Sequence, residues 1–360
     1  MKLVNGMSVT QKRKLDAFCS FRKEAILNHE LRNLFWQCTT RCNLNCTSCQ
    51  ANCNQPNSDT DMPLEDFLKV LDELKSRNQL LCPHIQLTGG EPLLRADLEQ
   101  CGMEFHRRGC SWGIDTNGIL LTPGRMFGFV DSGLVKVTIK LNGLENVQNW
   151  YWGSNLAFSK TIQSISMIQS FSLVDCEVET RVSRENVKQL PKLKTLLVEM
   201  KVKKWNLYTC RTNSESDFSN GNILRQEEYL ELLDFVQDER KKGDIDVHLS
   251  SDGFMGRYEL LVREEPFFCR AGVEQAAILA DGSISGGLDL EPEFSQGNIY
   301  TDSFANVWNN GFSLLRNREW TRQGICKECE YFVWCQGNAM YLRNGKTGTI
   351  RKCTVNEYNL

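Results

Sequence analysis

Apolar residues recur along this chain with two different periods, in stretches that alternate. Between residues 31 and 250, short stretches with a period of two alternate with longer stretches whose apolar residues recur every three or four positions. The first pattern is typical of strands and the second of amphipathic helices, so their alternation predicts a parallel α/β architecture. The six expected strands are residues 33–38, 84–88, 111–116, 135–141, 175–182 and 204–209.

The expected strands also alternate between apolar and polar residues. Along 135–141, for example, Val137 and Ile139 are interleaved with Thr138 and Lys140. Parallel strands covered on both faces are usually apolar throughout, and a closed eight-stranded barrel fills its centre with branched apolar side chains. Six alternating strands therefore predict an open partial (β/α)6 barrel of the TIM type around a polar cavity. A sheet with one solvent-facing side is the alternative.

The pattern also suggests how the chain divides. Residues 1–30 contain a charged helical stretch at 11–28 and form an N-terminal helical extension. Residues 31–250 form the barrel and 251–266 a linker, after which short runs punctuated by glycine and cysteine replace the regular pattern. We expect 267–360 to be a small cysteine-rich domain.

Charge and hydropathy exclude several classes of function. The 360 residues include 42 basic and 45 acidic side chains, for a net charge of -3, so no broad basic surface for nucleic acid is expected. The N-terminus lacks the apolar run of a signal peptide, and no stretch is long enough for a membrane span. A cytoplasmic protein is expected. Its 16 cysteines then indicate metal binding or redox chemistry, because a reducing compartment does not sustain a disulfide framework.

Three cysteines follow the first expected strand at close spacing: Cys42, Cys46 and Cys49. Thiolates are soft ligands that select iron–sulfur clusters or zinc. Three ligands on a four-iron cube leave one iron open, as catalytic sites require. Zinc is the alternative, and the flanking Cys38 and Cys53 are interpreted as spare thiols.

The C-x-x-x-C-x-x-C spacing after the first strand resembles the radical S-adenosylmethionine (SAM) superfamily. Gly-Gly-Glu-Pro follows the second strand, and the resemblance implies that this segment holds the amino group of SAM. It implies further SAM contacts after strands three and four. Arg181 lies on the polar face of strand five and is expected to pair with the SAM carboxylate, because a guanidinium pairs well with that anion. An ordinary surface arginine is the alternative. The expected SAM-binding residues are Gly89, Gly90, Glu91, Pro92, Thr116, Asn117, Asn142 and Arg181.

Four positions depart from the family pattern. Ser48 replaces the aromatic residue that commonly precedes the third cysteine, and Lys140 puts a cation where serine is usual. Gln148 and Trp152 stand where relatives often carry His and Arg. A substrate pocket different from that of the relatives is expected.

The C-terminal cysteines Cys326, Cys329, Cys335 and Cys353 supply four thiolates, a full set for a four-iron cluster or for zinc. Their spacing resembles the SPASM extension of radical SAM enzymes, whose full versions bind two auxiliary clusters. Two of the expected cysteine positions are Gly287 and Ala339 here. The resemblance therefore implies one auxiliary [4Fe-4S] cluster, with Cys269 left without a role and zinc as the alternative. The other cysteines are expected to be ordinary thiols.

The resemblance implies an enzyme that reductively cleaves SAM to a 5′-deoxyadenosyl radical, which abstracts hydrogen from a substrate. SPASM-bearing relatives mostly modify ribosomally made peptides or small proteins. The sequence also resembles the bacterial maturases that are encoded beside small lipoproteins. A reductant such as flavodoxin or ferredoxin is implied. Asp289 is the candidate catalytic base. A small-molecule or nucleic-acid substrate, or a non-catalytic Fe–S electron carrier or scaffold, are the alternatives.

Overall fold

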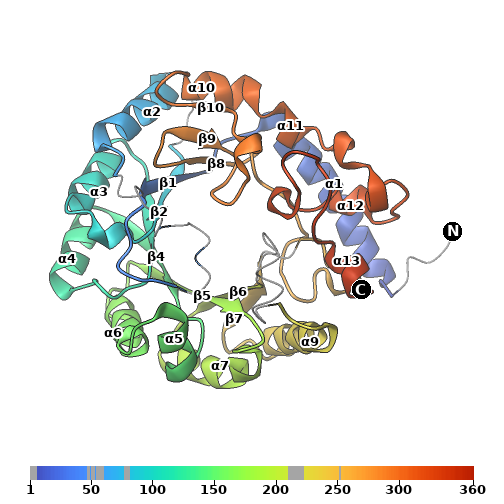
Figure 1. Ribbon diagram of the computed structural model, residues 1–360, viewed down its shortest axis with the longest axis horizontal. Helices are drawn as coiled ribbons and strands as arrows, with labels where there is room; N and C mark the ends of the chain where they lie inside the picture. The colour runs from blue at the N-terminus through green and yellow to red at the C-terminus, as the bar shows by residue number, and fades with distance from the viewer. Residues whose placement is uncertain are drawn as a thin grey trace.

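The computed structural model describes residues 6–46, 49, 53, 61–76, 82–209, 223–250 and 253–360. Its strands form a single curved sheet with helices on the outside (Figure 1). The strands are β1 (Asn33–Thr39), β2 (His84–Gly89), β3 (Trp112–Thr116), β4 (Leu134–Lys140), β5 (Asp175–Val182), β6 (Lys204–Thr209), β7 (Asp246–Leu249), β8 (Gln275–Ile278), β9 (Ser283–Ser285) and β10 (Gly297–Asn298).

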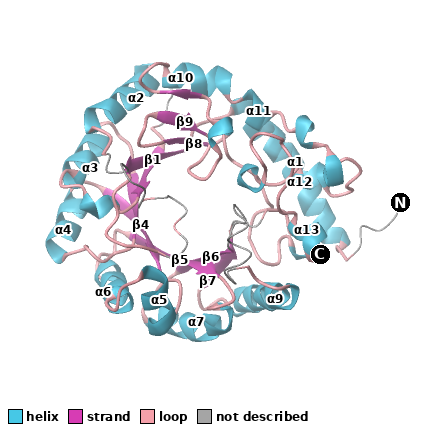
Figure 2. Cartoon of the chain, in the orientation of Figure 1, coloured by secondary structure: helices cyan, strands magenta, loops and turns pink. Residues whose placement is uncertain are grey.

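Most of the helices alternate with the strands and cover the convex face of the sheet, whereas the first helix and the last two lie together on the right of the view, where no strand is drawn (Figure 2). They are α1 (Val9–Asn28), α2 (Leu64–Ser76), α3 (Leu98–Arg107), α4 (Pro123–Asp131), α5 (Glu145–Trp152), α6 (Ala157–Gln169), α7 (Leu190–Glu199), α9 (Gln226–Lys242), α10 (Phe304–Asn306), α11 (Ser313–Arg316), α12 (Phe332–Cys335) and α13 (Thr354–Glu357). All six expected strands are present, within one residue at each end. The predicted leading helix is α1.

The sheet is open and has the order β10-β9-β8-β1-β2-β3-β4-β5-β6-β7. Strands β1 to β7 are parallel, and β8 pairs in parallel with the free side of β1. Strands β9 and β10 then add in antiparallel fashion. The predicted open partial barrel is confirmed. The sequence missed β7 as a seventh parallel strand, because four residues are too few to display a period of two.

Apolar side chains on the convex face of the sheet build the core under the helices. Trp36 stacks on Phe67 of α2 with ring centroids 4.3 Å apart, and Phe105 meets both rings edge-on. Trp112 and Phe129 continue this row of aromatic rings. Such contacts add to the hydrophobic burial that holds helices on a sheet. The polar residues that alternate with the apolar ones are left on the concave face.

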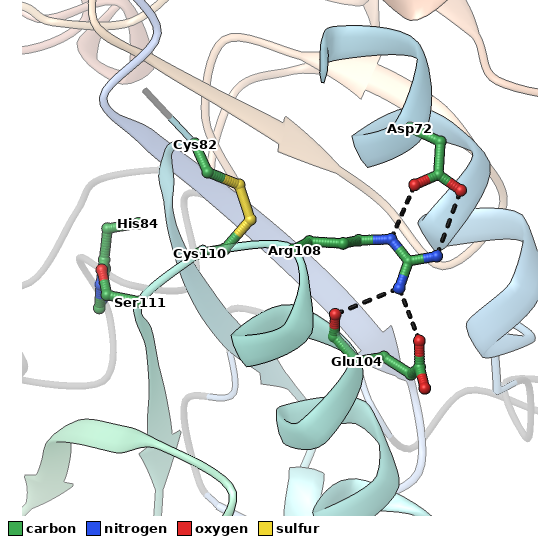
Figure 3. Close-up of a disulfide and its surroundings, with 7 residues drawn as sticks. All are labelled: Asp72, Cys82, His84, Glu104, Arg108, Cys110 and Ser111. Atoms are coloured by element: carbon green, nitrogen blue, oxygen red, sulfur yellow. Dashed lines mark hydrogen bonds and ion pairs between the residues drawn. A yellow bond between two sulfur atoms is a disulfide. The ribbon is translucent and has the colours of Figure 1, made fainter. Parts of the chain in front are cut away.

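Two of the cysteines expected to be ordinary thiols form a disulfide, Cys82–Cys110, at the amino-terminal side of the sheet (Figure 3). The expectation is wrong for this pair. Cys82 precedes β2 and Cys110 precedes β3, and the register that pairs Ile85 with Trp112 brings their Cα atoms to 5.0 Å. Beside it, the Arg108 guanidinium bridges Asp72 of α2 and Glu104 of α3.

Candidate functional site

Most of the predicted SAM and cluster residues lie around one cavity of about 350 Å³ at the carboxyl ends of the parallel strands. Ligand sites of open parallel sheets form at this end. The predicted residues on its wall are Cys42, Cys46, Cys49, Gly89, Gly90, Thr116, Asn117, Asn142, Arg181 and Asp289. Glu91 and Pro92 are buried behind the wall. Ser48, the departure noted beside the third cysteine, lies outside the described residues.

The glycine pair after β2 allows the cysteine loop to approach. A Cβ at Gly89 would lie 2.2 Å from the Thr39 carbonyl oxygen, and one at Gly90 would lie 2.1 Å from that of Arg41. Gly90 N donates to Thr39 O at 3.0 Å, and Glu91 N donates to Arg41 O at 2.8 Å. Only glycine permits this contact, so the pair fixes the strand that leads into Cys42 against the loop after β2.

Glu91 organises the loops instead of facing the cavity. Its side chain is fully buried, and its carboxylate accepts hydrogen bonds from Thr116 Oγ1 at 2.7 Å, from Asn117 N at 2.8 Å and from Leu93 N at 2.9 Å. Burial raises the pKa of this carboxyl, while the hydrogen bonds oppose that rise. Glu91 therefore ties the loop after β2 to the loop after β3.

Amide side chains extend this network to the rest of the rim. Asn117 Nδ2 donates to Asn43 Oδ1 at 2.8 Å, which connects the loop after β3 to the cysteine loop. Asn142 Oδ1 accepts from Arg181 N at 2.9 Å, and buried Gln148 accepts from Asn142 N at 2.7 Å. Gln148 thus positions Asn142 instead of facing the cavity.

Arg181 is buried at the end of β5 and also lines the cavity. Its Nη1 donates to Tyr151 Oη at 2.5 Å, and its guanidinium lies 5.7 Å from the centre of that ring. Tyr151 was missed by the sequence reasoning, although it precedes Trp152, which was singled out. Both aromatic residues line the cavity. They provide an apolar wall beside the cation.

The three cysteines of the motif share the cavity with a fourth, Cys53. Burial, together with Cys42 and Cys49, raises the pKa of Cys46 to about 12, and a hydrogen bond with Cys49 is the main cause of a raised pKa at Cys53. Neighbouring thiols that oppose each other's ionisation suit a cationic iron cluster, which stabilises the thiolate forms. Cys53, interpreted as a spare thiol, lies beside the motif.

Charged side chains from three neighbouring strands, β3, β4 and β5, line the same cavity as the cysteines. Lys140 on β4 is the register partner of Glu179 on β5, and Asp115 on β3 lines the same wall. Tyr208, Glu179, Asp115 and Asp289 all raise the pKa of the Lys140 ammonium, Tyr208 most strongly. Burial raises the pKa of Glu179 to about 7. The departure at position 140 thus puts a cation among acidic groups on the cavity wall.

The four C-terminal cysteines are gathered at a separate place, next to α1 and α12. Burial raises the pKa of Cys335, and Cys353, Cys326 and Cys329 raise it further. Among the described residues, no three His, Cys, Asp or Glu side chains are close enough to hold a single metal ion.

Three buried arginines surround these thiols, and no motif or spacing in the sequence marks them. Arg343 donates to Cys326 Sγ at 3.5 Å, and Arg22 of α1 donates to the carbonyl oxygens of Val333 and Trp334. Arg318 donates to Asn338 O. Within the described ranges none of the three has a carboxylate ion-pair partner. Buried cations are normally neutralised. Their setting therefore fits an anionic group on the four thiolates.

Both cysteine regions match known families. Residues 36–180 match the model of the Radical SAM superfamily, and residues 269–330 match SPASM, an iron-sulfur cluster-binding domain. The chain belongs to the radical SAM superfamily and carries a SPASM extension. The superfamily implies a [4Fe-4S] cluster and SAM, and the extension implies auxiliary iron–sulfur chemistry.

Proteins similar to this radical SAM chain are named for different molecules. Fe-coproporphyrin III synthase of Methanosarcina barkeri is 22% identical over 336 residues, which are 84% of this chain and 82% of that protein. Streptococcus suis SuiB bound to precursor peptide SuiA has a TM-score of 0.69 at 16% identity, with 93% of this chain and 79% of SuiB covered. For anSMEcpe with bound AdoMet the TM-score is 0.71 at 17% identity, with 91% of each chain covered.

The chain's residues fit these groups. The triad cavity offers soft thiols, glycine-lined space and a buried cation, and the C-terminal site offers four thiols within a cationic shell. None of the helices in the described part of the chain is long and apolar enough to cross a lipid bilayer.

Proposed function

We propose that this protein reductively cleaves SAM and uses the resulting radical to abstract hydrogen from a peptide or small protein. The observation that carries the proposal is that the cysteine triad, the glycine pair and Arg181 share one cavity. When bound, the cluster and SAM supply one electron and a carbon-centred radical. A flavodoxin or ferredoxin is the proposed source of the electron.

The chain's own residues position these reactants. Cys42, Cys46 and Cys49 would hold the cluster, and the buried Arg181 would pair with the SAM carboxylate. The Gly89 and Gly90 backbone lets the cysteine loop and the loop after β2 pack against each other at the wall of the cavity. The four thiols Cys326, Cys329, Cys335 and Cys353 would hold one auxiliary [4Fe-4S] cluster that exchanges an electron with the substrate.

Proton transfer in this proposal uses acidic groups that face the cavity. Asp289 lines it, as expected for the candidate base, and Glu179 has a carboxyl whose pKa of about 7 suits an acid or base near neutral pH. Either group would take or return a proton at its carboxylate oxygen. Glu179 is thus a second candidate for proton transfer. The alternating pattern of β5 indicates a polar face but does not single out Glu179 for this role.

A peptide substrate is supported by the fold shared with the peptide-bound SuiB. A small-molecule substrate is the second candidate, because the M. barkeri relative is named for a porphyrin. We propose that the reaction takes place in the cytoplasm.

The proposal is tested by measuring 5′-deoxyadenosine from SAM and dithionite with anaerobically reconstituted protein. We expect product from the wild type and none from the triple variant Cys42→Ala, Cys46→Ala, Cys49→Ala. A matched triple variant, Cys19→Ala, Cys101→Ala, Cys176→Ala, removes three thiols that do not line the cavity and should retain activity. Equal product from the wild type and the triad variant would refute the proposal.

A further inference from the structure

A second cavity, of about 660 Å³, adjoins the one that holds the cysteine triad. Phe35, Ser250, Leu288 and Asp289 line both cavities. The second one is lined by His248 and Leu249 of the edge strand β7, by Gln275 of β8, and by residues 263–271 of the segment between these two strands. Its size falls within the range of small-molecule pockets. A group bound there would lie next to the radical-generating site.

The wall of this cavity contains the three positions that the sequence set apart in the SPASM extension. Cys269, Gly287 and Ala339 all line it. They come from segments that are far apart in the chain. Gly287 and Ala339, the two positions where the SPASM pattern would have cysteine, therefore line the same cavity. Cys269 is the one cysteine among the lining residues that the structure describes. What Gly287 and Ala339 leave is open space beside the SAM cavity.

Gly287 is not required by the backbone. Its φ lies outside the left-handed region, and a Cβ there would meet nothing closer than Gln275 Nε2 at 3.5 Å. Its neighbour Gly286 differs, because a Cβ there would lie 2.6 Å from Leu315 Cδ1. The turn therefore does not require glycine at position 287, and the absence of a side chain there leaves the cavity open.

The remaining lining is mainly apolar and aromatic. Phe35, Phe267, Phe268, Leu288, Leu290 and Tyr341 contribute to it. Pockets that bind apolar groups have this character, with a few polar side chains that fix orientation.

The cavity has no surplus positive charge. Arg263 pairs with the buried Glu259 at 3.5 Å, and Arg270 pairs with Glu265 at 2.7 Å and with Glu274. Glu264 and Asp289 add acidic groups to the wall. A ligand rich in carboxylates would meet already neutralised arginines and further carboxylates, at a cost in free energy. The lining favours an uncharged ligand.

We propose that this cavity is the substrate chamber, and that it receives an apolar or aromatic side chain of an uncharged peptide segment in space that other SPASM extensions fill with a cluster. This rests on the proposed function for the peptide class. The peptide backbone next to the bound side chain would lie at the junction marked by Phe35 and Asp289. The cavity would hold no iron.

The test footprints Cys269 in the anaerobic holoenzyme with N-ethylmaleimide, read by peptide mass spectrometry with Cys19 as internal reference. The probes are three nonapeptides that differ only in a central Trp, Lys or Glu, together with Fe-coproporphyrin III. We expect Cys269 to react, and the Trp peptide to slow its alkylation at least about threefold. The Glu peptide and the porphyrin should not protect it. Iron content should be about eight per chain, as for two four-iron clusters.

Gly287→Phe fills the cavity from a position with room for a side chain. It should keep the iron content of the wild type and abolish protection by the Trp peptide. Gly124→Phe, at a remote position where a Cβ meets nothing within 4 Å, should behave as the wild type.

Four outcomes would overturn the inference: an unreactive Cys269 with about twelve iron atoms per chain, protection by the porphyrin equal to that by the Trp peptide, no protection by any probe, or full protection in Gly287→Phe. A wild type that shows the footprint but forms no 5′-deoxyadenosine would instead refute the proposed function and leave the chamber intact.

Discussion

Arg343 should set the reduction potential of the auxiliary cluster. Its side chain is almost completely buried, donates to Cys326 Sγ at 3.5 Å, and has no carboxylate ion-pair partner in the described part of the chain. A buried cation stabilises the reduced cluster, which carries one more negative charge. Replacing it with a neutral side chain should therefore make reduction harder.

The size of the effect follows from Coulomb's law. At 3.5 Å and an effective dielectric constant of about 20, one charge pair is worth about 5 kcal/mol. The added electron is shared by the whole cluster, and the mean distance from the Arg343 guanidinium to the cluster atoms is greater than 3.5 Å. We therefore expect an interaction energy of about half of 5 kcal/mol. For a one-electron couple, about 2.3 kcal/mol corresponds to about 100 mV.

The assay is an anaerobic redox titration of the auxiliary cluster by electron paramagnetic resonance, with the Cys42, Cys46 and Cys49 triad replaced by alanine. Arg343→Gln should lower the potential by about 100 mV, and Arg343→Lys, which keeps the charge, should lower it much less. Arg316→Gln is the matched control. Arg343 donates to the carbonyl oxygens of Gly337 and Gly348, and Arg316 likewise donates to backbone carbonyl oxygens, but Arg316 donates to none of the four thiols. A potential unchanged in Arg343→Gln at full iron content would refute the reasoning.

Three further predictions concern the barrel. Gly90→Ala places a Cβ 2.1 Å from Arg41 O, so we expect at least a tenfold loss of 5′-deoxyadenosine formation, with Gly124→Ala unaffected; equal rates would contradict the role of the glycine pair. The pKa of Glu179 is raised from 4.5 to about 7, so the folded state binds the extra proton and loses stability as pH rises through that interval. In urea unfolding, the free energy of unfolding of Glu179→Gln should rise relative to that of the wild type between pH 5 and pH 8, and the exposed control Glu185→Gln should show no such rise. An unchanged difference between Glu179→Gln and the wild type would contradict the raised pKa of Glu179. The disulfide closes a separation of 28 residues, which predicts about 3–4 kcal/mol of stabilisation over the double variant Cys82→Ser, Cys110→Ser; dithiothreitol should destabilise the wild type and not the variant, and a wild type insensitive to the reductant would contradict the pairing.

The sequence predicted the barrel because period-two alternation reports directly which face of a strand is polar. All six strands read in this way are present, and the interleaved residues, such as Lys140 and Glu179, face the cavity. The division into domains at 251–266 stays a prediction. The continuous hydrogen bonding from β1 to β8 could not have been foreseen, since pairing between distant segments leaves no periodic trace.

The site was predictable where a motif places several residues together, and less so where one side chain acts through others. The cavity gathers the triad and Arg181, but Glu91 bonds to Thr116 and to the Asn117 backbone behind its wall. The direction in which a motif side chain points depends on how the surrounding residues pack, and the sequence of the motif does not show this. The same holds for the Cys82–Cys110 bond, which depends on the register of two strands.

The docking of α1 bears on how the protein matures. Arg22 bonds to Val333 and Trp334 Nε1 donates to Asp16 Oδ1 at 2.9 Å, across more than 300 positions of chain. During synthesis α1 therefore leaves the ribosome more than 300 residues before the segment it packs on, and it can dock only after that segment has been made. The segment that α1 packs on includes Cys335 of α12, so docking of α1 and assembly of the four C-terminal thiols depend on the same distant part of the chain.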